Sequence, residues 1–250
     1  MSDRARIVVA IDGPAAAGKS STAHWVAERV GFRHVDSGAL YRAATAAQLR
    51  ADPDPSHWTE RGVLAAAALV GLVPRPTAFL PVIAGADSEL EIRSSDVTRH
   101  VSGVAQMPGV REWVNAHVRA LARDYDVVVD GRDIGTVVFP EAALKVFLVA
   151  DPWERARRRL VERLGRRPTE SEIAEETDRI VKRDAQDATQ TVQARDAVLI
   201  DTTALTQEEQ VARIVALVEA VLARAAPSGG AGAAAGAIRQ PADGPGPAAG

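Results

Sequence analysis

The sequence predicts an α/β fold: a five-stranded parallel sheet flanked by helices. Short apolar segments alternate with longer amphipathic segments along residues 1–225, which is the order of strand–helix–strand units. Three of the five short segments are continuous aliphatic or β-branched runs, which is typical of strands that are covered on both faces. The 250 residues contain no Cys, so disulfides and cysteine-bound zinc do not contribute to the fold.

The strands and helices are expected in alternation along this folded part. The expected strands are residues 7–11, 33–36, 127–130, 145–149 and 198–201. The expected helices are residues 20–30, 110–123, 152–164, 170–187 and 207–225. Between them, residues 63–91 are broken by Pro74, Pro76 and Pro81, and this stretch predicts a small β-rich insertion.

Composition excludes several classes of protein. The five His are scattered without i,i+4 pairs, which argues against a histidine metal site. No apolar run approaches the roughly 20 residues of a membrane span, and the first strand leaves no room for a signal peptide, so a cytoplasmic protein without a membrane partner is expected. A net charge of −3 argues against a nucleic-acid polymer as partner. Residues 226–250 hold seven Gly and four Pro with almost nothing to bury, and predict a disordered tail.

A phosphate-binding motif connects the first expected strand to the first expected helix. Residues 13–20 read Gly-Pro-Ala-Ala-Ala-Gly-Lys-Ser and match G-x-x-x-x-G-K-[ST], the P-loop. In this motif the backbone N–H groups face phosphates at the positive end of the following helix. Lys19 would reach the β- and γ-phosphates, and the Ser20 hydroxyl would ligate Mg²⁺. The residues expected to bind ATP or GTP are Gly13, Pro14, Ala15, Ala16, Ala17, Gly18, Lys19, Ser20 and Ser21.

Two polar segments follow expected strands at the edge of the sheet that carries the P-loop. Residues 36–42 come after the second strand and residues 130–140 after the third. Ligands of open α/β sheets bind at this carboxyl edge, so Arg42 and Arg132 are expected to hold a phosphate, and Asp133 to accept hydrogen bonds from an amino group. Taken separately, each segment is equally compatible with a plain turn. No N/T-K-x-D element for reading guanine occurs, and the size favours a small-molecule or nucleotide kinase.

A group of arginines after the fourth strand predicts a lid. Seven Arg begin the segment 155–187, which is expected to exclude water from the reacting phosphate. Arg155, Arg158 and Arg159 share a helical face at i, i+3, i+4 spacing, where fixed cations would stabilise a migrating phosphoryl group. Arg183 would return from the second lid helix toward the same centre. For most of the seven, a solvated helix face balanced by Glu is the alternative.

In this order, the segments resemble the bacterial cytidylate kinase family of P-loop nucleoside-monophosphate kinases. The resemblance runs from about residue 8 to about residue 221 and rests on residues 11–21, 36–42, 101–112, 130–140, 154–159 and 196–203. It implies a three-layer fold with an insertion around residues 63–100 that binds the nucleoside monophosphate. It also implies a monomer that transfers the γ-phosphoryl group of Mg-ATP to CMP or dCMP.

The resemblance further implies roles for individual side chains. The residues that would hold CMP are Ser37, Arg42, Ser102, Arg111, Arg132, Asp133, Arg183 and Asp187. Ser102, Arg111 and Asp133 would lie nearest the cytosine, whose amino donor suits a carboxylate and whose N3 and O2 acceptors suit a guanidinium. The cations that would act in catalysis are Lys19, Arg132, Arg158 and Arg183, while Arg155 and Arg159 would join the P-loop in binding ATP.

The chain departs from the family pattern in two places. Gln190 stands where the family often has Arg, in a segment after the lid that is several residues shorter. The insertion reads Ala-Asp-Ser-Glu at residues 86–89 and lacks the usual Asp-Val-Ser turn. Two alternatives therefore stay open: a small-molecule kinase with another acceptor, and a P-loop nucleotide-binding regulator without kinase activity.

Overall fold

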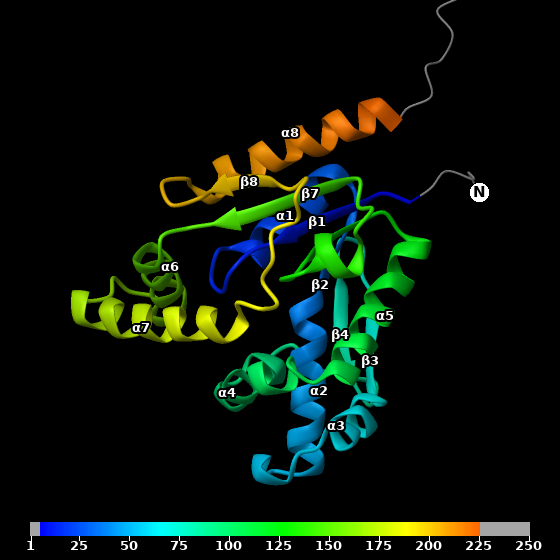
Figure 1. Ribbon diagram of the computed structural model, residues 1–250, viewed down its shortest axis with the longest axis vertical. Helices are drawn as coiled ribbons and strands as arrows, with labels where there is room; N and C mark the ends of the chain where they lie inside the picture. The colour runs from blue at the N-terminus through cyan, green and yellow to red at the C-terminus, as the bar shows by residue number, and fades with distance from the viewer. Residues whose placement is uncertain (1–5, 226–250) are drawn as a thin grey trace, which may run out of the picture.

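Five parallel strands form the main sheet of the computed structural model, which describes residues 6–225 (Figure 1). Their order across the sheet is β2-β6-β1-β7-β8, so the P-loop strand β1 is central. The bounds are β1 (Val8–Asp12), β2 (Arg33–Asp36), β6 (Val127–Asp130), β7 (Leu144–Val149) and β8 (Val198–Asp201). All five expected strands are confirmed, with ends that differ by one residue at most. The tail expected at residues 226–250 lies outside the described residues.

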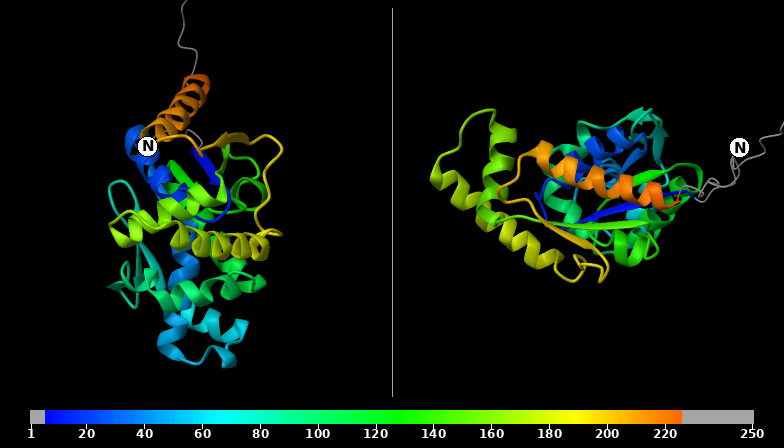
Figure 2. Two further views of the ribbon diagram at one scale, coloured as in Figure 1. Left: turned by 90° about the vertical axis from the view of Figure 1, so that its left-hand side faces the viewer. Right: turned by 90° about the horizontal axis from the view of Figure 1, so that it is seen from above.

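Helices cover both faces of this sheet and give three layers (Figures 1 and 2). On one face, Val26 of α1 and Ile214 of α8 pack against strand residues such as Val9. On the other, Leu40 of α2 and Val118 of α5 pack against the same strands. These helices are α1 (Lys19–Val30), α2 (Ser37–Ala51), α5 (Pro108–Asp124) and α8 (Gln207–Ala225). Within the described range 6–225, none of the helices is long and apolar enough to cross a membrane.

A smaller unit extends from α2 away from the sheet (Figure 1). Its elements are η1 (Pro55–His57), α3 (Glu60–Ala67), β3 (Val70–Pro74), β4 (Phe79–Ile83), β5 (Ala86–Asp87), η2 (Glu91–Arg93) and α4 (Ser95–Val104). The three strands form an antiparallel sheet, so the β-rich interpretation of residues 63–91 is correct for its central part. It is wrong at the start, where Val63 and Ala67 belong to α3 because they bury one apolar helix face against Ala44 of α2 and Val110 of α5.

Helix caps decide where the elements beside the site begin. Residues 36–42 open α2 instead of forming a plain turn, because the Asp36 carboxylate accepts the Ala39 N–H at 3.0 Å. The helices α6 (Pro152–Leu164) and α7 (Glu170–Asp187), which the sequence predicted as a lid, have the expected bounds. They begin at Asp151, an N-cap before Pro, and at a Thr169–Glu172 capping box.

Candidate active site

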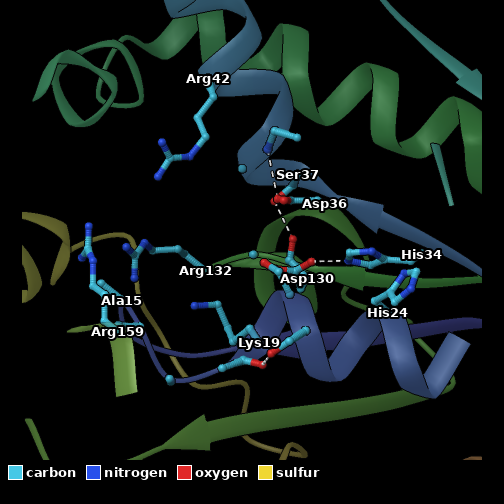
Figure 3. A pocket seen from close by; sticks show the side chains of 18 of the residues that line it. Ala15, Lys19, His24, His34, Asp36, Ser37, Arg42, Asp130, Arg132 and Arg159 are labelled. Atoms are coloured by element: carbon cyan, nitrogen blue, oxygen red, sulfur yellow. Dashed lines mark hydrogen bonds and ion pairs between the residues drawn. The ribbon is translucent and has the colours of Figure 1, made fainter. Parts of the chain in front are cut away.

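A cavity of about 1450 Å³ opens along the carboxyl edge of the parallel sheet (Figure 3). The structure brings most of the predicted site residues together around it, from the P-loop, α2, α4, α5, the segment after β6, α6 and α7. Those that line it are Ala15, Ala16, Ala17, Gly18, Lys19, Ser20, Ser21, Ser37, Arg42, Ser102, Arg111, Arg132, Asp133, Arg158, Arg159, Arg183 and Asp187. Gly13, Pro14 and Arg155 do not line it.

The P-loop takes its shape from residues that tolerate unusual backbone angles. Gly13 and Gly18 have φ of +147° and +80°, and Ala16 adopts φ of +57°. The Lys19 ammonium folds back and donates to the Pro14 carbonyl at 2.7 Å. Since α1 begins at Lys19 and its first residues line the cavity, the positive N-terminal end of the helix is available to an anion.

Gly13→Ala is expected to lower the free energy of unfolding by about 2–5 kcal/mol, because strain and overpacking add at this position. A Cβ at Gly13 would lie 2.2 Å from the Leu148 carbonyl oxygen, which is backbone and cannot easily yield. Denaturant unfolding measures the loss. Gly103→Ala is the matched control, since a Cβ within α4 would meet nothing within 4 Å; it should be neutral or stabilise by about 0.5–1 kcal/mol. Equal stabilities of the two variants would contradict the close approach at Gly13.

Cationic side chains converge beside the P-loop. Burial, together with the charge of the neighbouring Arg132, lowers the pKa of Lys19 to about 8. Burial and the charge of Arg132 also lower the pKa of Arg183. Both guanidiniums share one carboxylate, because Asp187 Oδ2 lies 2.7 Å from Arg132 Nη2 and 3.6 Å from Arg183 Nε. Three partly buried cations thus converge on one part of the cavity, and the two guanidiniums share Asp187 between them, so this part is suited to an anion.

Two more arginines reach the cavity from the insertion side and from the lid. Arg42 donates to the Ile92 carbonyl at 3.3 Å and to the Thr98 hydroxyl at 3.0 Å, which ties α2 to the insertion. Burial and the charge of Arg183 lower its pKa to about 10. Arg159 lies 3.3 Å from Glu176 of α7. These side chains stay charged at neutral pH and extend the cationic wall of the cavity (Figure 3).

The lowered pKa of Lys19 predicts a pH dependence of nucleotide binding. In the free protein Lys19 is charged below pH about 8, and an anionic phosphate would raise its pKa, so binding takes up a proton above that pH. Affinity for ATP is therefore expected to be level just below pH 8 and to fall by up to about tenfold per pH unit above it. Calorimetry in buffers of different ionisation enthalpy measures the proton uptake. Lys19→Arg should remove the decline, since a guanidinium does not titrate there; a decline that persists in this variant would assign it to another group.

Ser20 of the P-loop lies against a carboxylate that sequence reasoning did not single out. Its hydroxyl donates to Asp130 Oδ2 at 2.6 Å, and Asp130 Oδ1 lies 2.6 Å from His34 Nε2. Ser37 donates to the Asp130 carbonyl at 2.7 Å. Sequence reasoning could have found Asp130 from its position, because it is a carboxylate at the end of a fully buried strand, which lies next to β1.

The Ser20–Asp130 pair fits Mg²⁺. Hydroxyl and carboxylate oxygens are hard ligands, and Mg²⁺ is commonly held by one or two of them together with waters and substrate phosphates. Among residues 6–225, no group of three or more His, Asp or Glu could hold a metal ion unaided. A metal in this cavity would therefore be bound jointly by the protein and a nucleotide.

A second polar group lies in the segment after β6. Asp133 is 8% exposed and pairs with Arg111 of α5, whose other nitrogen donates to Gln190 at 2.8 Å and to the Ala105 carbonyl at 3.1 Å. Burial raises the pKa of Asp133, while Arg111 opposes the rise. Ser102 of α4 lines the same cavity. The cavity thus offers a carboxylate acceptor beside guanidinium donors.

Asp12, at the end of β1, was also missed by sequence reasoning. Its two oxygens accept the N–H groups of Ile134 and Gly135, each at 2.8 Å. Burial raises its pKa to about 6, against the lowering effect of these two hydrogen bonds. The side chain fixes the start of η3 (Ile134–Val138), which directly follows Asp133, and so determines where Asp133 lies.

The three arginines at i, i+3, i+4 spacing in α6 have different partners. Arg155 is 4% exposed and donates to the Ala15 carbonyl at 2.8 Å and to Asp184 at 2.6 Å. Arg155, which was expected to bind ATP, thus contacts the backbone of the P-loop and does not line the cavity. Arg158 lines the cavity while its Nη2 donates to the Thr202 carbonyl at 2.7 Å. Arg159 faces the cavity beside the P-loop (Figure 3).

Comparison with known proteins places the chain among related sequences. The family model described as "Cytidylate kinase" matches residues 9–220, from β1 into α8. The chain is 43% identical over 217 residues to the cytidylate kinase of Geobacillus thermodenitrificans, and equally to that of Geobacillus kaustophilus; each alignment covers 85% of this chain and 96% of the relative. It is 38% identical over 215 residues to the cytidylate kinase of Limosilactobacillus reuteri, covering 84% and 94%.

Proposed function

The chain belongs to the cytidylate kinase family, and we propose that the protein transfers the γ-phosphoryl group of ATP to CMP and dCMP in this cavity. The observation that carries the proposal is one cavity lined both by Lys19 of the P-loop with the neighbouring Arg132 and Arg183 and by the Arg111–Asp133 pair. The first group suits a triphosphate, and the second suits a base that carries an amino donor beside acceptors. The products are ADP and the cytidine or deoxycytidine diphosphate.

In the donor half, the P-loop segment 13–21 binds the phosphates of ATP through its backbone and through Lys19. Ser20 and Asp130 would hold Mg²⁺, whose bound charge neutralises the β- and γ-phosphate oxygens. Arg159 adds a cation from α6, where its ion pair with Glu176 already holds the guanidinium at the cavity wall. Arg158 takes a second position on the donor side, beside the Thr202 carbonyl.

In the acceptor half, Asp133 accepts a hydrogen bond from the cytosine amino group and Arg111 donates to N3 or O2. Gln190, at a position where the family often has Arg, bonds to Arg111 and helps to hold that guanidinium in place. Ser102 completes the base pocket. The residues proposed for the ribose and the acceptor phosphate are Ser37, Arg42, Arg132, Arg183 and Asp187.

The transfer itself needs little covalent chemistry from the protein. An oxygen of the acceptor phosphate forms the new bond to the γ-phosphorus, and the bond from that phosphorus to the β,γ-bridging oxygen breaks, leaving its electron pair on ADP. The acceptor phosphate is ionised near neutral pH, so no general base is required. Lys19, Arg132 and Arg183 stabilise the charge on the migrating group, and the α6–α7 pair is the proposed lid that excludes water.

The architecture also supports proposals on partners. Lys19, Arg132 and Arg183 converge inside one cavity, which favours small anions over a nucleic-acid polymer. We propose a monomer that acts in the cytoplasm on free nucleotides.

The test is ADP release measured across CMP, dCMP, UMP, AMP and shikimate as acceptors. Turnover is expected with CMP and dCMP, and much less with the others. Activity on AMP or shikimate without activity on CMP would mean that CMP is not the acceptor, and would favour a small-molecule kinase with another acceptor. Binding of ATP without turnover on any acceptor would favour a nucleotide-binding regulator.

A further inference from the structure

We infer that His34 is a positioning residue for the metal-binding pair: it fixes the Asp130 carboxylate so that Oδ2 stays on the Ser20 hydroxyl. The inference rests on the proposed function, since it concerns the metal that accompanies ATP. His34 lies on β2, beside β6, and neither the P-loop nor the acceptor segment contains it.

Both oxygens of the Asp130 carboxylate have a partner, and these partners come from opposite sides. His34 Nε2 lies 2.6 Å from Oδ1 (Figure 3). The Ser20 hydroxyl lies 2.6 Å from Oδ2. Asp130 is only 3% exposed, so water does not readily replace either contact. A carboxylate held at one oxygen can still turn about its side-chain bonds. A second hydrogen bond at the other oxygen removes that freedom, as outer-shell partners of metal ligands commonly do.

His34 is itself held from several directions. Its backbone N–H donates to the Thr77 carbonyl at 2.9 Å, and it forms a bridge with Ala78, so the β3–β4 turn of the insertion covers it. Its ring stands edge-to-face against the ring of His24, with centroids 5.9 Å apart. The imidazole therefore presents Nε2 to Asp130 from a fixed position, and it connects the insertion to the metal-binding pair.

His24 provides a matched control in the same cavity. It has the same ring, it also lines the cavity, and its aromatic neighbours are Trp25 and His34. Among residues 6–225, the His24 ring makes no hydrogen bond to a carboxylate. His24→Phe therefore keeps an aromatic ring against His34 and leaves the contact between His34 and Asp130 in place.

The test measures how strongly Mg²⁺ improves ATP binding, with no acceptor present. Calorimetry gives the ATP Kd in saturating Mg²⁺ and in EDTA, and the ratio of the two values reports the contribution of the metal. In His34→Phe this ratio is expected to fall by about tenfold or more, the scale found for second-shell partners of metal ligands. His34→Gln keeps an N–H donor and should retain most of the ratio, and His24→Phe should leave it unchanged.

The outcomes separate this inference from the proposed function. A merely structural role would change both Kd values together and leave the ratio intact, so an unchanged ratio in a folded His34→Phe protein overturns the inference. An equal fall in His24→Phe overturns it too. If His34→Phe does not fold, His34→Ala removes the donor without adding volume and answers the same question. A wild-type protein that binds Mg-ATP but phosphorylates no acceptor would refute the proposed kinase activity and leave the role of His34 testable by the same ratio.

Discussion

Lys19→Ala is expected to reduce turnover by about 10³-fold or more with every acceptor, because it removes a fixed cation from the charge that develops on the migrating phosphoryl group. The ammonium is buried beside Arg132 and Arg183, in surroundings where a charge interacts more strongly than in water. The remaining arginines cannot move into its place, since Arg132 is paired with Asp187 and tied to the Gly13 carbonyl at 3.3 Å. The loss should appear in kcat as well as in the KM for ATP.

ADP release and thermal unfolding, measured on the same preparations, check this expectation. Lys182→Ala is the matched control, because Lys182 is an exposed lysine on α7. It should keep wild-type turnover. Lys19→Arg should recover charge but not geometry, since the planar guanidinium does not replace a compact ammonium. Turnover by Lys19→Ala within about tenfold of wild type would show that Lys19 does not stabilise the migrating phosphoryl group.

The sequence predicted the parallel sheet because its strands are short, buried and uninterrupted. Residues 127–130 carry three Val in succession, a pattern that only a strand with both faces covered accommodates well. Helix α3 and the helical nature of residues 36–42 were not predicted. Ala and Gly make up half of α3, and Ser37, Gly38 and Ala39 open the other segment, so both give little periodic signal, and packing between α2 and α3 supplies the missing stability.

Motif order predicted which segments meet at the cavity, but not the partner of each side chain. Ser20 and Asp130 are 110 positions apart, and their contact depends on β6 lying next to β1. The same holds for Asp12, whose partners follow β6. In α6, spacing showed that three arginines share a face, yet α7 pairs with Arg155 through Asp184 and with Arg159 through Glu176, and of these two only Arg159 lines the cavity. The local sequence specifies only on which face of a helix a side chain lies. The neighbouring helix or strand then decides which residue that side chain contacts.

Asp133→Ala is expected to lower the preference for CMP over UMP by about 10- to 100-fold, the worth of a hydrogen bond to a charged group. The carboxylate can accept from the amino group of cytosine but repels the corresponding carbonyl oxygen of uracil, so it contributes both attraction and exclusion. The effect should lie mainly in KM for CMP, because Lys19 and the other cations at the phosphates are untouched. Steady-state kinetics with both acceptors at saturating ATP measure it.

Asp133→Asn distinguishes base recognition from general damage to the pocket. The amide keeps nearly the same size, and its NH₂ can donate to the uracil oxygen, so UMP turnover should rise as CMP turnover falls. Glu112→Ala is the control, because Glu112 is exposed on α5 next to Arg111 and should leave both acceptors unaffected. A CMP-over-UMP preference that stays at the wild-type value in both Asp133 variants would mean that the cytosine amino group is recognised elsewhere in the cavity.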